Sequence, residues 1–203
     1  MMNPVVSMMA ASFLLAAVAP AGTAEVRERT KYFTVTGTTL EELDRDLSRK
    51  GPLMTATGLR HPGATEVKFD GKVTYQPLEG ACRVAGTGLN LRLVKTLPKW
   101  TAPRGASPTT AIVWKTLSDD IARHEADHAR IAKAYVKKME SALRNLRPEA
   151  DCAAMEARVN AVSARYLADH QRAQLEFDTV EGREMNRRLK RLLARNVREA
   201  VAE

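Results

Sequence analysis

The feature that most constrains the fold is a helical repeat of apolar residues in the second half of the chain. Between residues 117 and 146, apolar side chains recur at spacings of three and four, the period of one face of an α-helix. The repeat has one gap, between Ile121 and Ile131, and His124 and His128 fill it on the same face. The sequence therefore predicts a long amphipathic helix that turns two histidines toward the interior of the protein.

These histidines belong to the segment His124-Glu125-Ala126-Asp127-His128. Positions i and i+4 lie one above the other on a helix, so both imidazoles can reach one ion. The carboxylate of Glu125 can touch a water on that ion without binding the ion itself. This is the geometry of the H-E-x-x-H zinc hydrolases, and we predict a zinc site here. The alternatives are a hydrogen-bonded pair of core histidines and a chance match on a solvated face.

Composition and the N-terminal sequence bound the location and the domain count. The chain has 203 residues, 44% of them hydrophobic, which suits one domain with a real core. Residues 1–24 lack Asp, Glu, Lys and Arg, contain the apolar stretch 12–19 and end in Gly22-Thr23-Ala24. We predict a signal peptide cleaved after Ala24 and a single domain over residues 25–203, periplasmic or secreted. A retained membrane anchor is the alternative, although a spanning helix needs roughly 20 apolar residues.

Export affects how the two cysteines of the chain are interpreted. In an oxidising compartment Cys82 and Cys152 most simply form one disulfide, whereas in the cytosol they would be buried thiols. The bridge would tie the N-terminal half of the chain to the helical half. In the chain-entropy model it stabilises the fold by roughly 3–5 kcal/mol.

The net charge of +8 raises the question of an anionic partner. The densest basic run, over residues 183–198, contains no aromatic side chain for base stacking. We therefore expect a solvated helix face and no nucleic-acid partner. An anionic envelope surface, such as phospholipid or cell wall, is a further partner for a basic exported protein. We expect a monomer or a weakly associating protein.

The first half of the mature chain shows the pattern of strands around one helix. A strand over 32–36 precedes a helix with Thr38 and Glu41 as its capping box and Gly51-Pro52 as its end. A period of two over 67–75 predicts one long strand, because a hairpin turn at Asp70-Gly71 would split its apolar side chains between two faces. A second long strand returns over 82–97, with a bulge at Gly86 and Gly88. A loop follows, over 97–108.

Three helices complete the predicted fold, over about 117–146, 151–176 and 182–201. Strands followed by helices indicate an α+β protein. We predict a small antiparallel β-sheet with an N-terminal helix, covered by three C-terminal helices, the first of which carries the two histidines.

A family pattern runs through nearly all of the mature chain. Its elements are, in order, Tyr32-x-x-Val35-x-Gly37, Gly51-Pro52, the strand 65–75, Gly80-x-Cys82, Leu97-Pro98-x-Trp100, Trp114, His124-Glu125-x-x-His128, Cys152 and Phe177-Asp178. In these the chain resembles the DUF922 group of bacterial proteins, described as predicted secreted zinc-dependent proteases. The H-E-x-x-H element is the specific one. The chain departs from the pattern after Phe177-Asp178, where Glu181 stands in place of a family histidine.

The third zinc ligand has two candidates. A catalytic zinc takes three protein ligands and keeps one position open. If the helices over 117–146 and 151–176 form an antiparallel hairpin that turns near Pro148, His170 faces His124. The resemblance instead implies Glu181 as the ligand, with Asp178 as a residue that orients a ligating histidine. Both candidates stay open.

The predicted function is that of an exported zinc metallohydrolase, most simply a peptidase acting on peptides or proteins with Glu125 as the general base. One alternative is a non-catalytic zinc-binding envelope protein that binds a partner or an anionic surface, which a filled fourth coordination position would indicate. A second is a metal-free helical interaction module, which metal analysis would identify.

Overall fold

The computed structural model describes residues 24–54 and 58–202, so the predicted signal segment lies outside the described residues except for Ala24. Within the described ranges no helix is long and apolar enough to cross a membrane. The predicted α+β class is confirmed. The elements are β1 (Glu25–Val35), α1 (Leu40–Lys50), β2 (Leu53–Met54), β3 (Leu59–Arg60), β4 (Ala64–Leu78), β5 (Ala81–Trp100), α2 (Pro108–Arg144) and α3 (Cys152–Ala202).

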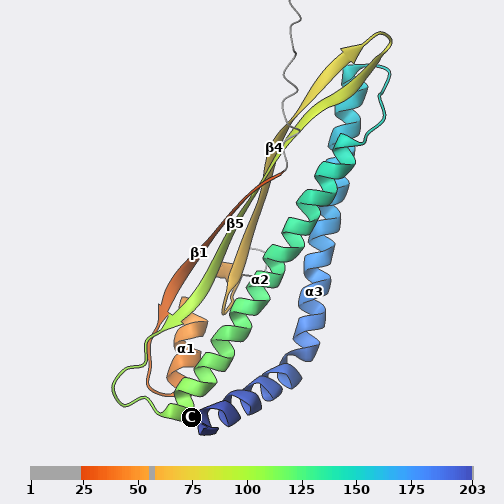
Figure 1. Cartoon of the computed structure of the whole chain (residues 1–203). Helices are drawn as coiled ribbons and strands as arrows, with labels where there is room; N and C mark the ends of the chain where they lie inside the picture. The colour runs from red at the N-terminus through yellow and green to blue at the C-terminus, as the bar shows by residue number, and fades with distance from the viewer. Residues whose placement is uncertain (1–23, 55–57, 203) are drawn as a thin grey trace, which may run out of the picture.

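One layer of the molecule is a three-stranded sheet in the order β1-β5-β4 (Figure 1). Strands β4 and β5 pair antiparallel along almost their whole lengths, which confirms the two long strands and the uninterrupted chain through Asp70-Gly71. The register shifts by one residue where Thr74 pairs with Gly86 and Tyr75 with Val84. The bulge therefore lies beside Gly86, close to its predicted place, and increases the local twist.

The sheet is mixed rather than antiparallel as predicted, because β1 runs parallel to β5 on the side away from β4. Nearly every residue of β1 is exposed, so the period of two that reveals a half-buried strand is missing from most of it. The backbone ladder holds β1 to β5, and Glu28 adds ion pairs with Lys95 of β5 and Lys133 of α2. Strand β5 also continues to Trp100, where a loop was predicted. Pro98 is tolerated there because the β4 pairing ends at Thr96.

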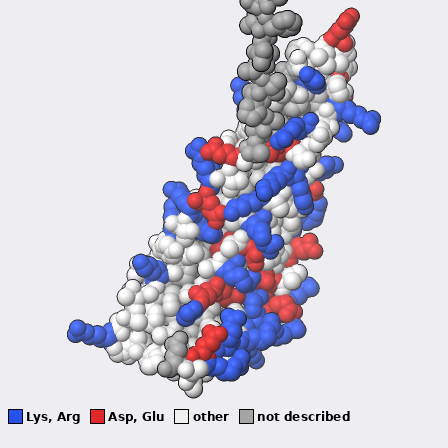
Figure 2. Space-filling view, in the orientation of Figure 1, with Lys and Arg blue, Asp and Glu red and all other residues white. Residues whose placement is uncertain are grey.

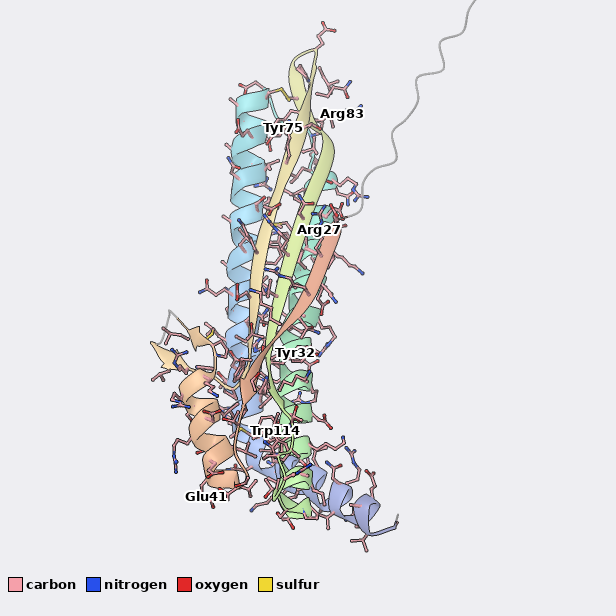
Figure 3. All side chains as sticks on the ribbon, turned by 90° about the vertical axis from the view of Figure 1, so that its left-hand side faces the viewer. Arg27, Tyr32, Glu41, Tyr75, Arg83 and Trp114 are labelled. Carbon is pink, nitrogen blue, oxygen red and sulfur yellow. A yellow bond between two sulfur atoms is a disulfide. The ribbon has the colours of Figure 1, made fainter. Side chains whose placement is uncertain are left out.

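The other layer consists of α2 and α3, which lie side by side against one face of the sheet (Figures 1 and 3). Helix α2 begins nine residues before its predicted start, because Ser107 accepts a hydrogen bond from the Thr110 amide and Pro108 occupies the first turn. Helix α3 is one helix of 51 residues where two were predicted. Gly182 costs only about 1 kcal/mol relative to alanine, too little to end a helix without a proline. The helix bends in its C-terminal third instead (Figure 1).

The main core fills the space between the two layers at the end of the molecule that holds the β4–β5 turn. Its fully buried side chains come from β5, α2 and α3, and include Leu91, Leu93, Val136, Leu143 and Met155. The predicted disulfide between Cys82 and Cys152 is confirmed, with the Cα atoms 5.0 Å apart. It joins the start of β5 to the start of α3.

A smaller core lies near the opposite end, where α1 packs on β1 and α2. It consists of Val35, Leu43, Leu47, Trp114 and Ile121. The capping box of α1 is formed by Thr39 and Glu42, one residue later than predicted. Basic side chains gather toward this end, over the last part of α3, with acidic groups among them (Figure 2). Two of them pair within the helix, Arg187 with Glu184 and Arg195 with Glu199.

Candidate metal centre

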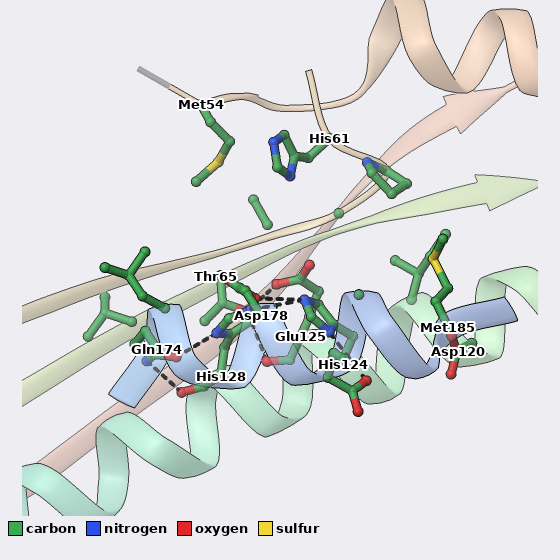
Figure 4. Close-up of a pocket in the computed structure, with 18 of the residues that line it drawn as sticks. Met54, His61, Thr65, Asp120, His124, Glu125, His128, Gln174, Asp178 and Met185 are labelled. Atoms are coloured by element: carbon green, nitrogen blue, oxygen red, sulfur yellow. Dashed lines mark hydrogen bonds and ion pairs between the residues drawn. The ribbon is translucent and has the colours of Figure 1, made fainter. Parts of the chain in front are cut away.

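Two histidines of α2 and one aspartate of α3 form the centre of the site. The Nε2 atoms of His124 and His128 lie 3.0 Å apart, as the i and i+4 spacing predicts. Oδ1 of Asp178 lies 2.9 Å from Nε2 of His128 and 3.3 Å from Nε2 of His124 (Figure 4). One ligand atom of each residue falls within 4.8 Å of the others. We call His124, His128 and Asp178 the metal group, because two imidazoles and a carboxylate are a donor set that zinc takes.

The side chain of Gln174 fixes which nitrogen of His128 carries the proton. Its Nε2 donates to the backbone carbonyl of His128 at 3.1 Å, so its Oε1 must be the atom that faces Nδ1 of His128. An amide oxygen only accepts, and Nδ1 is therefore protonated. In the neutral imidazole Nε2 of His128 then carries the lone pair, and this atom faces the other members of the metal group. Ligating histidines are commonly oriented in this way by a carbonyl oxygen.

The protonation state of His124 also suits a metal ligand. Burial lowers the pKa of His124, and the neighbouring His128 lowers it further, while the carboxylates of Asp178 and Glu181 act in the opposite direction. The imidazole is thus held in its neutral form near pH 7, which is the form that binds metals. Convergent lone pairs on His124, His128 and Asp178 repel one another unless a proton or a cation lies between them. The residues present therefore fit a cation at this point.

Glu125 lies beside the metal group and is almost fully buried. The hydroxyl of Thr65, at the start of β4, lies 2.8 Å from its Oε2 and 2.9 Å from its backbone carbonyl. Burial raises the pKa of Glu125, and the hydrogen bond from Thr65 partly offsets this. The backbone of Gly63 covers the same carboxylate so closely that a Cβ atom there would lie 2.7 Å from Ile121 and 3.0 Å from Oε1 of Glu125.

The two residues predicted as third ligands lie outside the metal group. Glu181 is engaged by two guanidinium groups, those of Arg123 and Arg188. Its Oε2 also lies 3.7 Å from Nδ1 of His124. The Nε2 atom of His170 accepts from the Gln174 amide at 2.9 Å. Of His170, Asp178 and Glu181, Asp178 is thus the residue that the structure places against the Nε2 atoms of both histidines.

The offset between the two helices explains why His170 misses the metal group. His124 faces Asp178, eight residues further along α3 than His170, which is about two helical turns. The cause is the connection over residues 145–151, which continues beyond the end of α2 before α3 turns back (Figure 1). There Glu149 and Cys82 of β5 exchange two backbone hydrogen bonds, of 2.8 and 3.0 Å.

Sequence reasoning missed the roles of Phe177, Gln174 and Thr65. The ring of Phe177 stacks on His124 and meets His128 edge-on, with both centroid distances 5.0 Å. Gln174 precedes Asp178 by one helical turn, so the helical period would have revealed it once Asp178 was known. No local pattern connects Thr65 to Glu125, because 60 residues separate them.

A pocket of about 800 Å³ opens beside the metal group, between α2, α3, the start of β4 and the segment that precedes it (Figure 4). This volume lies within the range of small-molecule sites in proteins, roughly 300–1,000 Å³. Both Glu125 and the metal group line it. The carboxylate of Glu125, the metal group and a space for a ligand therefore meet at one place.

The comparison with family models agrees with the order of these elements along the chain. The model of DUF922, described as a bacterial protein of unknown function, matches residues 30–196. The chain belongs to the DUF922 family. The match runs from β1 to near the end of α3 and includes every residue of the metal group. Neither a curated protein nor a solved structure matches this DUF922 protein. Its function is therefore inferred from the site.

Proposed function

We propose that this DUF922 protein is an exported zinc metallohydrolase that cleaves peptides or proteins. One observation carries the proposal. Ligand atoms of His124, His128 and Asp178 converge within 4.8 Å, and the buried carboxylate of Glu125 lies next to them in the same pocket. Three residues that can hold zinc and a separate carboxylate that can act as an acid–base group are the minimum set for metal-assisted hydrolysis, and this supports the proposal.

His124, His128 and Asp178 would hold the zinc ion. When bound, zinc supplies a Lewis acid that polarises a carbonyl group and lowers the pKa of water. Gln174 keeps His128 in the tautomer whose Nε2 faces the ion. Phe177 packs on both imidazoles and holds their rings in place. The ligands are thus oriented before the ion arrives, which favours tight binding.

Glu125 is the general base of the proposed reaction. Thr65 holds Oε2, which leaves Oε1 to take a proton from the attacking water and to pass it to the leaving amine. The pKa of Glu125, raised by burial, makes the carboxylate a stronger base than an exposed glutamate. Glu125 does not belong to the metal group, so the acid–base role and zinc binding can be separated by mutation.

The test compares zinc-loaded wild type with Glu125→Gln on a library of unstructured peptides. We expect the variant to keep its zinc and its melting temperature and to lose about 10²–10⁴-fold in rate, the usual contribution of one positioned base. Glu176→Gln is the matched control, because Glu176 is exposed on α3 and should behave as wild type. Full activity of Glu125→Gln would contradict the mechanism. A wild type that holds zinc but cleaves nothing would support the non-catalytic zinc-binding alternative.

A further inference from the structure

Most of the surface that lines the pocket beside the metal group is apolar. Ile121 forms part of its α2 wall, and Leu175, Met185 and Leu189 form much of its α3 wall. Met54 lies across the cavity from the metal group (Figure 4). These groups come from parts of the chain that are distant in sequence. They surround a space that no described part of the chain fills.

Large apolar side chains along this wall are open to solvent. The exposed fraction is 41% for Leu167, 61% for Leu175 and 46% for Met185, although α3 buries other apolar residues completely against the core. Exposed apolar surface costs roughly 25 cal/mol per Å² relative to burial. Exposed apolar surface that is concentrated in one cavity is typical of a ligand-binding site.

Three charged residues of the lining, Asp120, Glu181 and Arg188, are already paired. Nε of Arg188 lies 2.8 Å from Oδ1 of Asp120, and its Nη1 lies 3.1 Å from Oε2 of Glu181. Arg123 also contacts both carboxylates. An apolar ligand group beside Met185 and Leu189 would leave these pairs intact.

We propose that this pocket receives a bulky apolar side chain, leucine-like or phenylalanine-like, of the peptide that the metal centre cleaves. The peptide nature of the ligand rests on the proposed function. The preference for an apolar group rests on the lining alone. The pocket would place such a side chain next to the metal group and Glu125, so the bond beside a large apolar residue would be the one presented for hydrolysis.

Nuclear magnetic resonance of the metal-free protein tests the preference without any activity measurement. The probes are N-acetyl-leucinamide and N-acetyl-phenylalaninamide, compared with N-acetyl-aspartamide and N-acetyl-lysinamide. We expect saturable shifts of the methyl signals of Ile121, Leu175, Met185 and Leu189 with the apolar probes, at about 10- to 100-fold lower concentration than with the charged ones. Equal responses to charged and apolar probes, or no response of these methyl groups, would overturn the proposal.

Three substitutions on α3 sharpen the same measurement. Met185→Gln and Leu175→Gln put a polar group of similar length into the wall and should weaken binding of the apolar probes at least threefold. Val180→Gln is the control, because Val180 is 51% exposed on the same helix and does not line the pocket. Equal effects of the three substitutions would overturn the assignment of the site.

Cleavage data then distinguish this inference from the proposed function. Zinc-loaded wild type should prefer bonds next to leucine or phenylalanine, and Met185→Gln should reduce that preference. Binding of the apolar probes by a protein that cleaves no peptide would refute the proposed function alone. Cleavage without sequence preference by a protein that binds no apolar probe would refute the pocket inference alone.

Discussion

The two ends of the α2–α3 pair differ in what they bury. The end near the β4–β5 turn holds the larger apolar core and the disulfide, with Leu91, Leu143, Met155 and Cys82 fully closed from water and Glu140 buried among them. The end near the C-terminus has the smaller apolar core, buries Asp120 and Glu125 and keeps a pocket open. We call these the closed end and the open end. Helix α2 spans both ends. Its buried residues from Ala129 to Leu143 belong to the closed end, and Glu125 and His128 lie just before them, at the open end.

This contrast indicates that one end of the molecule mainly supplies stability and the other forms the candidate site. A buried carboxylate such as Glu125 and an open pocket both cost free energy relative to a packed apolar core. The closed end supplies compensating stability through apolar packing and a cross-link. Because both helices run unbroken from one end to the other, the closed end also holds Asp178 of α3 in register with the histidines of α2. The following substitutions test this division.

Removal of the disulfide should have the largest effect, and the effect should be on stability. Cys82 and Cys152 are 70 residues apart, so the double variant Cys82→Ser, Cys152→Ser should lose about 4 kcal/mol of unfolding free energy in the chain-entropy model. Urea denaturation of the metal-free proteins measures this loss. Zinc affinity of the folded variant should stay close to that of wild type. Loss of zinc binding in a variant that is still folded would show that the two ends are not separable.

Loss of the Gln174 amide should have a smaller effect, on metal binding instead. Gln174→Leu removes the group that orients His128, and the expected loss is about 10- to 100-fold in zinc affinity with little change in melting temperature. Competition with a chromogenic chelator measures the affinity. Gln171→Leu, on an exposed position one turn earlier, is the matched control. If both variants bind zinc alike, Gln174 does not position His128.

Acidification should have the smallest effect and act at the open end. Burial lowers the pKa of His124 and the pKa of His170 below 6.5, so the unfolded chain binds protons that the folded protein excludes. The contribution of these two histidines to stability is therefore present above pH 6.5 and falls as the pH drops below it. Titration of the imidazole ring protons of metal-free protein by nuclear magnetic resonance checks this. Midpoints at or above 6.5 for His124 and His170 would contradict it.

The sequence alone predicts those features that repeat locally along the chain. The helical period placed His124, Glu125 and His128 on one helix, and the period of two gave the strands β4 and β5. The cysteine count gave the disulfide. Strand β1 was largely missed because its residues are exposed on both faces, and its partner strand β5 is distant in sequence.

The third member of the metal group depends on an offset that no local pattern carries. Asp178 reaches the histidines only because the connection over 145–151 pairs with β5 and shifts α3 by about two turns. The contact between Thr65 and Glu125 likewise depends on how the sheet packs on α2. Such features follow from tertiary packing, which a single sequence does not show.

Zinc content per chain is the most direct measurement of the central claim, that His124, His128 and Asp178 hold one metal ion. Mass spectrometry of tag-free, zinc-reconstituted protein should find about one zinc per wild-type chain. We expect occupancy to fall to near zero in His124→Ala, His128→Ala and Asp178→Ala, and to persist in Glu181→Gln and His170→Asn. Wild-type protein without zinc after reconstitution would contradict the claim. So would full zinc occupancy in Asp178→Ala together with no zinc in Glu181→Gln or His170→Asn.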